Sequence, residues 1–191
     1  MNQAKKFIYY LIAYIKFIRS FFLKSNSKWF DPYRNQTISI EGYKSVFCGY
    51  YDLNPFCPKN SNLLAIHGAK FKSSTPSNGK RVIDILIYDI KNKTYKKIDS
   101  TAAWNWQQGA RLHWINEEEI IYNKIKNKKA FAVIYNHKTL KKRNLDYPFS
   151  CIDNKGTIYS LNYHLLNRTS EYGYKNLNDQ KYELKKFNIN E

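Results

Sequence analysis

Two short segments of the chain combine aromatic rings with polar side chains that can bind hydroxyl groups. The first is Gly-Tyr-Tyr-Asp at 49–52, and the second is Trp-Asn-Trp-Gln-Gln-Gly at 104–109. Specific small-molecule pockets place a few polar groups among apolar and aromatic surfaces, and flat rings suit the apolar faces of sugars. We therefore predict a sugar-binding site made of the following residues: Tyr50, Tyr51, Asp52, Trp104, Asn105, Trp106, Gln107, Gln108, Arg111 and His113.

A structural role is the alternative for the same residues. Aromatic rings can wedge between packed sheets, and Asn or Gln side chains can bond the backbone of their own loop. The sequence leaves this alternative open beside the ligand-binding one.

The titratable residues form no known catalytic or metal-binding motif. The histidines include no closely spaced pair and no HExxH pattern; they are His67, His113, His137 and His164. His113 with Gln107 is the one conceivable metal-ligand pair, and we predict neither a metal site nor a cofactor. Asp52 and Asp84 are far apart in sequence, which argues against a paired acid and base, and no GxSxG nucleophile motif is present. The catalytic residues, and whether the chain is an enzyme, are left open.

An internal repeat indicates the elements that position these residues. Residues 87–97 contain Ile-Tyr-Asp followed by Lys-Thr-Tyr-Lys-Lys, and residues 134–142 contain Ile-Tyr-Asn followed by Lys-Thr-Leu-Lys-Lys. Each copy reads as a strand, a tight turn and a second strand. Four-stranded units that recur every ~40–50 residues are typical of β-propeller blades, which bury their faces against neighbouring blades.

The predicted fold is mainly β, an incomplete β-propeller of about 2.5 four-stranded antiparallel blades after an N-terminal amphipathic α-helix. The units are 46–99, 104–146 and 147–191. The first is expected to contain strands at 49–53, 63–67, 82–88 and 95–98, and the second at 110–114, 120–122, 130–135 and 140–145. In the third, only 149–151, 157–161 and 182–189 read as strands, and 162–176 reads as loop. The first and last units are each expected to keep an uncovered face.

The N-terminal residues predict a membrane-surface helix. Residues 5–24 carry their basic side chains on one arc and apolar side chains on the opposite face. The longest uncharged stretch, 7–15, is too short to span a bilayer core, which needs ~20 apolar residues. A basic amphipathic helix suits the plane of an anionic membrane surface. Packing on its own domain or on a partner, and a poorly inserted single-span anchor, are the alternatives. Residues 25–36 are the predicted linker, and 37–191 the β domain.

The charge and the cysteines limit the classes of partner and compartment. The formal net charge is +17 at pH 7, but the basic residues are mostly lysine, which recognises phosphates and bases less specifically than arginine. No nucleic-acid-binding motif is present, so nucleic acid is not an expected partner. Cys48, Cys57 and Cys151 form no CxxC pair, and we expect free thiols in a cytoplasmic protein held at the inner membrane surface.

Several motifs resemble those of one protein family. They are Phe-Cys-Gly-Tyr-Tyr-Asp at 47–52, Asn-Pro at 54–55, the run 103–112, Tyr-Ser-Leu-Asn-Tyr at 159–163 and Glu-Tyr-Gly-Tyr at 171–174. Over about residues 46–174 the chain resembles the TolB-like or YncE-like β-propeller proteins encoded among bacterial surface-polysaccharide biosynthesis genes. The resemblance implies a carbohydrate-related context and a full propeller, of which this chain would be a truncated form.

These observations predict a membrane-associated carbohydrate-binding or scaffold protein of cell-envelope polysaccharide biosynthesis. The alternatives are a carbohydrate-active enzyme, lyase-like or glycosyltransferase-like, and a nonfunctional truncated fragment. The expected partners are glycans or glycan-biosynthesis proteins, an anionic membrane surface bound through 5–24, and further copies of the chain bound through open blade edges.

Overall fold

The computed structural model describes residues 38–50, 52–170, 172–179, 181 and 184–189. The helix expected at 1–24, the linker expected at 25–36 and Tyr51 lie outside the described residues. The described part of the chain is mainly β, with several antiparallel sheets and one short helix. No helix in this part is long and apolar enough to cross a membrane.

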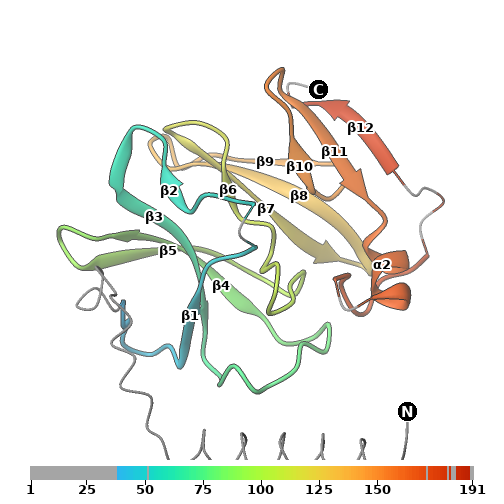
Figure 1. The fold of residues 1–191 in the computed structure, drawn as a ribbon, viewed down its shortest axis with the longest axis horizontal. Coiled ribbons are helices and arrows are strands. Elements are labelled where there is room, and N and C mark those ends of the chain that lie inside the picture. The colour runs from blue at the N-terminus through green and yellow to red at the C-terminus, as the bar shows by residue number, and fades with distance from the viewer. Residues whose placement is uncertain (1–37, 51, 171, 180, 182–183, 190–191) are drawn as a thin grey trace, which may run out of the picture. The chain divides into compact units, whose positions relative to one another are not determined.

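Three antiparallel sheets succeed one another along the chain (Figure 1). The first contains β1 (Ser45–Phe47), β2 (Phe56–Cys57), β3 (Asn60–Ala69), β4 (Ile83–Asp89) and β5 (Thr94–Thr101). The second contains β6 (His113–Trp114), β7 (Glu119–Lys126), β8 (Lys129–Asn136) and β9 (Lys142–Leu145). The third contains β10 (Cys151–Ile152), β11 (Thr157–Leu161) and β12 (Leu184–Asn188), with α2 (Tyr163–Thr169) between β11 and β12. Strands β3 to β5, β6 to β9 and β10 to β12 each pair with the next in order, as in a meander.

The later strands of the first two units are confirmed. Strands β3, β4 and β5 contain the residues expected at 63–67, 82–88 and 95–98, apart from Val82. Strands β7 and β8 contain those expected at 120–122 and 130–135, and β9 covers most of 140–145. The apolar runs and the polar turns between them are therefore sufficient signals for these elements.

The inner strand expected at 49–53 is wrong, and of the one expected at 110–114 only the last two residues form a strand, β6. In the first sheet β1 and β2 pair with opposite ends of β3, with Ser45 opposite Ala69 and Cys57 opposite Asn60, and the chain leaves the sheet between them. In the second sheet, only His113 and Trp114 of the expected inner strand join the ladder, opposite Ile121 and Ile120 of β7. Gly109 and Arg111 have φ values of 58° and 55°, a left-handed conformation that a pleated strand cannot contain.

Helix α2 falls within residues 162–176, which the sequence indicated as loop. The Asn162 side chain accepts a hydrogen bond from the Leu165 N–H at 3.0 Å and so caps the first turn. Leu166 packs in a cluster with Leu161 and Ile125. A helix of 7 residues contains too few turns to show a clear apolar period, so only its tertiary contacts reveal it.

The second sheet is packed on both faces. On one side, Ile120 and Tyr122 of β7 join a buried cluster with Ile83, Ile85 and Ile87 of β4. On the other, Ile121 and Ile134 join a cluster with Phe149 and Ile158, which belong to the third unit. Successive side chains of β7 point to opposite faces of the second sheet, so this one strand packs against both the first and the third unit.

The far face of the first sheet is also covered, which corrects the expectation of an open face there. Ile40, which is 4% exposed, packs with Leu64, Ile66, Leu86 and Tyr88. Large apolar side chains that remain exposed in the described residues are scattered over the sheets: Phe56, Val82, Tyr95, Leu140 and Leu184. Self-association through blade edges stays a prediction.

Candidate functional site

The predicted Trp-Asn-Trp-Gln-Gln-Gly segment folds as a closed loop rather than as part of a strand. The backbone groups of Asn105 and Gly109 exchange two hydrogen bonds, at 3.3 and 2.9 Å. The Asn105 side-chain oxygen accepts from the N–H groups of Gln107 at 3.1 Å and Gln108 at 2.7 Å, as Asn does in tight turns. We call residues 105–109 the Asn105 loop.

His67 of β3 supports the base of this loop. Its Nε2 accepts a hydrogen bond from the Ala110 N–H at 3.1 Å, so the proton lies on Nδ1, which faces the Phe47 carbonyl at 3.3 Å. Burial lowers the pKa of His67 to about 4 and keeps the ring neutral near pH 7. Gly109 is required here, because a Cβ on it would lie 2.3 Å from His67 Cε1.

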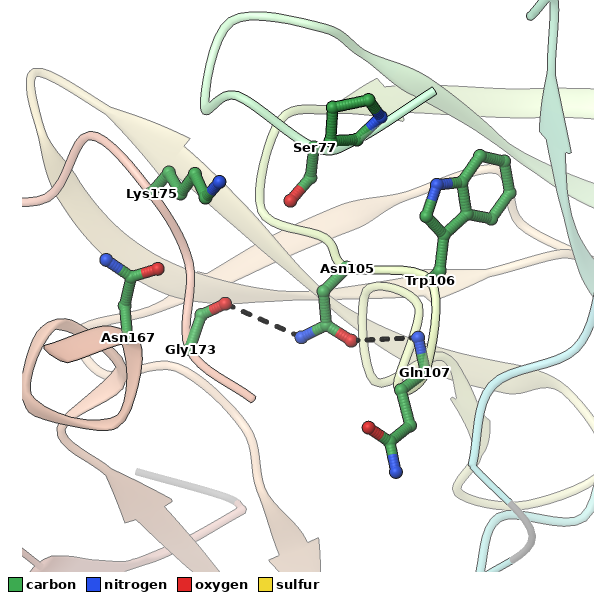
Figure 2. A pocket seen from close by; sticks show the side chains of 8 residues that line it. Ser77, Asn105, Trp106, Gln107, Asn167, Gly173 and Lys175 are labelled. Atoms are coloured by element: carbon green, nitrogen blue, oxygen red, sulfur yellow. Dashed lines mark hydrogen bonds between the residues drawn. The ribbon is translucent and has the colours of Figure 1, made fainter. Parts of the chain in front are cut away.

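The Asn105 loop forms one wall of a pocket of about 640 Å³, which we call the Asn105 pocket. Figure 2 shows Asn105, Trp106 and Gln107 on one side, and Asn167, Gly173 and Lys175 on the other. The eight lining residues are Pro76, Ser77, Asn105, Trp106, Gln107, Asn167, Gly173 and Lys175. They come from the loop after β3, the Asn105 loop, α2 and the segment that follows α2.

The Asn105 amide holds the two walls together. Its nitrogen donates to the carbonyls of Tyr172 at 3.0 Å and Gly173 at 3.5 Å. Gln107 reinforces the contact by donating to the Tyr172 hydroxyl at 2.9 Å. Gly173 is tightly packed, since a Cβ on it would lie 2.1 Å from the backbone nitrogen of Asn167. The second wall therefore depends on a glycine and on an amide 68 residues earlier in the chain.

The two tryptophans of the predicted site occupy different environments. Trp106 lines the pocket and is half-buried, with its indole N–H donating to the Thr75 carbonyl at 2.7 Å. Trp104 is 1% exposed and its indole N–H donates to the Arg81 carbonyl at 2.7 Å. Burial leaves neither face of Trp104 free for a sugar, which favours the wedge alternative for this residue.

Arg111 and Asp52 form a second group, away from the lining of the pocket. The Arg111 guanidinium is bidentate to the Asp52 carboxylate, at 3.2 and 2.9 Å, and its Nε and Nη2 both donate to the Ser150 carbonyl, the former at 3.0 Å. Burial disfavours the charge, but Asp52 outweighs it and raises the pKa of Arg111. We call Arg111, Asp52 and Ser150 the Arg111 clamp, because it joins segments of all three units.

The remaining predicted residues lie around these two groups. His113 begins β6, and its ring is nearly parallel to that of Phe149, with the ring centroids 6.0 Å apart. Burial, followed by the charge of Arg111, lowers the pKa of His113. The rings of Tyr50 and Tyr172 form a T-shaped pair with their centroids 6.3 Å apart. Gln108 is half-buried and does not line the Asn105 pocket. In the described part of the chain, no cluster of three or more His, Cys, Asp or Glu residues is placed to hold a metal.

Sequence reasoning missed several residues of the Asn105 pocket. Ser77, Asn167 and Lys175 are more than 25 residues from the Asn105 loop, in segments that carried no chemical motif. The one available signal was the Glu-Tyr-Gly-Tyr motif at 171–174, which contains Gly173. Comparison of the chain with protein-family models, with curated proteins and with solved structures gave no match.

Proposed function

We propose that the chain is a carbohydrate-binding module, built as an incomplete propeller, and that the Asn105 pocket is its glycan site. The observation that carries this proposal is the lining of the pocket, which combines the Trp106 indole with hydroxyl, amide and ammonium groups. Ligand sites of ~300–1,000 Å³ suit small molecules, so a volume of about 640 Å³ suits a few sugar units.

The pocket retains polar groups that a sugar can use. Within the described residues, the side chains of Ser77, Asn167 and Lys175 make no hydrogen bond to other parts of the chain, whereas Asn105 is fully occupied by its own loop and by Gly173 and Tyr172. Free hydroxyl, amide and ammonium groups can exchange water for sugar hydroxyls without leaving buried protein groups unpaired. Asn105 would then shape the site, and its neighbours would bind the ligand.

Binding is favoured over catalysis by the same lining. None of the eight residues of the Asn105 pocket is a carboxylate or an imidazole, the groups that glycoside chemistry uses as acid and base. The Asp52 carboxylate belongs to the Arg111 clamp, where it is bidentate to Arg111, and it is not part of the pocket lining.

The wider setting follows from the repeat and the resemblance. Three successive antiparallel meanders that bury their faces against one another support a propeller-like arrangement. The resemblance to surface-polysaccharide propeller proteins gives the glycan class, and the basic amphipathic residues 5–24 would hold the module at an anionic membrane. A scaffold role in cell-envelope polysaccharide biosynthesis is consistent with both.

Glycan titration of the full chain tests the proposal. Maltotriose, chitotriose and trigalacturonic acid are added while tryptophan fluorescence is recorded, because Trp106 would contact the ligand. At least one should bind, and Trp106→Ala should weaken it by about tenfold. Since Trp106 also packs on Phe47 and Trp104, near-ultraviolet circular dichroism must show that the variant is folded. Unchanged affinity in a folded Trp106→Ala chain would exclude the Asn105 pocket as the site.

A further inference from the structure

A second hollow is lined by residues from both ends of the loop between β3 and β4, together with residues of β3, β4 and β5. It has a volume of about 420 Å³ and shares no lining residue with the Asn105 pocket. Its rim carries four cationic side chains, Lys70, Lys80, Arg81 and Lys97, and its polar lining also includes Asp84 and Ser100. We call it the Lys80 hollow.

Asp84 is already matched by its own partners. Its carboxylate accepts from Tyr43 Oη at 2.8 Å and Ser100 Oγ at 2.6 Å, and forms an ion pair with Lys97 Nζ at 2.9 Å. Burial opposes the charge on Asp84, but the bonds from Ser100, Lys97 and Tyr43 outweigh it and lower the pKa. Lys97 and Asp84 therefore neutralise each other, and the positive charge that remains belongs to Lys70, Lys80 and Arg81.

These three cations have no carboxylate partner within the described residues. Arg81 Nη1 donates to the Pro76 carbonyl at 2.9 Å, which leaves its other N–H groups available. Unpaired lysines are common on a solvated surface. Three unpaired cations around one concave site are different, because the hollow concentrates their potential.

The backbone beneath Lys80 and Arg81 is fixed. The Asn78 side-chain oxygen accepts from both of their N–H groups, at 3.0 and 2.8 Å. The Arg81 carbonyl accepts from the buried Trp104 indole at 2.7 Å. Gly68, Asp84 and Ser100 form a cross-strand row over three paired strands. The hollow thus rests on a rigid base, which lowers the entropy cost of holding a ligand.

We propose that the Lys80 hollow binds the phosphate group of a phosphorylated ligand. A guanidinium offers a planar pair of donors to phosphate oxygens, and two ammonium groups add point charges around it. The volume admits a sugar phosphate or a diphosphate group, either free in solution or carried on a lipid. This site is independent of glycan binding in the Asn105 pocket.

Calorimetric titration of the full chain with inorganic pyrophosphate tests whether the Lys80 hollow binds a phosphate that is free in solution. The variant Lys80→Gln/Arg81→Gln should bind about tenfold more weakly than the unchanged chain. The matched control is Lys138→Gln/Lys141→Gln, which removes the same charge from two exposed residues of the β8–β9 turn and should change the affinity less than about twofold. If the rim variant fails to fold, Lys70→Gln replaces it, with an expected loss of about threefold.

Titration with vesicles of phosphatidylcholine and phosphatidic acid tests whether the hollow binds a phosphate group carried on a lipid. Residues 5–24 are also expected to bind these vesicles, so only the difference between the rim variant and the control pair counts. A loss of affinity confined to the rim variant, Lys80→Gln/Arg81→Gln, supports the site. If the loss occurs with pyrophosphate, the ligand is a free phosphate; if it occurs with the vesicles, the ligand is a lipid-borne phosphate. Equal losses in the rim variant and the control pair, or no loss in either titration, overturn it.

Discussion

The Asn105 pocket and the Arg111 clamp use the same kinds of side chain, and they differ in what those side chains leave unused. In the clamp, Arg111 is 4% exposed and its donors are directed at Asp52 and Ser150. In the pocket, Asn105 is equally occupied, but Ser77 and Asn167 keep polar groups that no other part of the described chain binds. A polar side chain becomes a ligand site only where the fold does not consume its hydrogen bonds.

Removing the clamp arginine should have the largest effect on stability. Arg111→Gln leaves the Ser150 carbonyl and the Asp52 carboxylate without their charged donor, and losing one partner of a buried pair costs ~3–5 kcal/mol. Because the Asp52 side chain is 43% exposed, we expect the lower end, about 3 kcal/mol. Urea denaturation measures it. Arg168→Gln, on the exposed end of α2, should cost less than about 0.5 kcal/mol; equal effects would contradict the clamp.

Acidification should weaken the support of the Asn105 loop. The unfolded chain takes up a proton on His67 near pH 6.5, whereas the folded state does so only near pH 4. Stability is therefore full above pH 6.5 and falls as the pH decreases through this window, by up to roughly 3 kcal/mol. Denaturation midpoints across this range measure the loss. His67→Gln should flatten the slope; a variant as steep as the unchanged chain would assign the titration to other groups.

The substitution Gly109→Ala should lower the free energy of unfolding by about 2 kcal/mol, because the backbone there is left-handed and the added Cβ would clash with His67. Gly42→Ala is the matched control, because its φ of 83° is also left-handed while no atom lies within 4 Å of the added Cβ. It should cost only about 1 kcal/mol. Thermal denaturation compares the two, and equal shifts would show that backbone strain alone, without the His67 contact, sets the cost.

The sequence was informative about strands and weak about the path between them. Periodic apolar residues placed β3, β4, β7 and β8, because local pattern and burial agree there. The Asn105 loop could not be predicted from the sequence, because its path depends on the close approach of Gly109 to His67, 42 residues earlier in the chain. No local pattern indicates such a contact.

The candidate site shows the same limit. Trp104 and Trp106 are the same residue type two positions apart, and only the fold distinguishes them: Trp104 is buried with its N–H on Arg81, and Trp106 lines the pocket. Asn105, Trp106 and Gln107 were predictable as polar and aromatic neighbours. Asn167 and Lys175 were not, because the chain brings them to the pocket only after a helix that the sequence did not reveal.

The smallest effect on stability should accompany a large effect on binding. Asn167→Ala removes a half-buried amide that makes no hydrogen bond within the described part of the chain, so the free energy of unfolding should change by less than about 0.5 kcal/mol. If the pocket binds glycans, the same change should weaken the best of the three trisaccharides by about fivefold or more, because one hydrogen bond to the ligand is lost. Arg111→Gln should show the reverse pattern, a large loss of stability with unchanged affinity in the fraction that stays folded. Measuring both variants by denaturation and by titration separates the two regions directly. Parallel losses of stability and affinity in Asn167→Ala would mean that the pocket is held together by the groups we assign to its ligand.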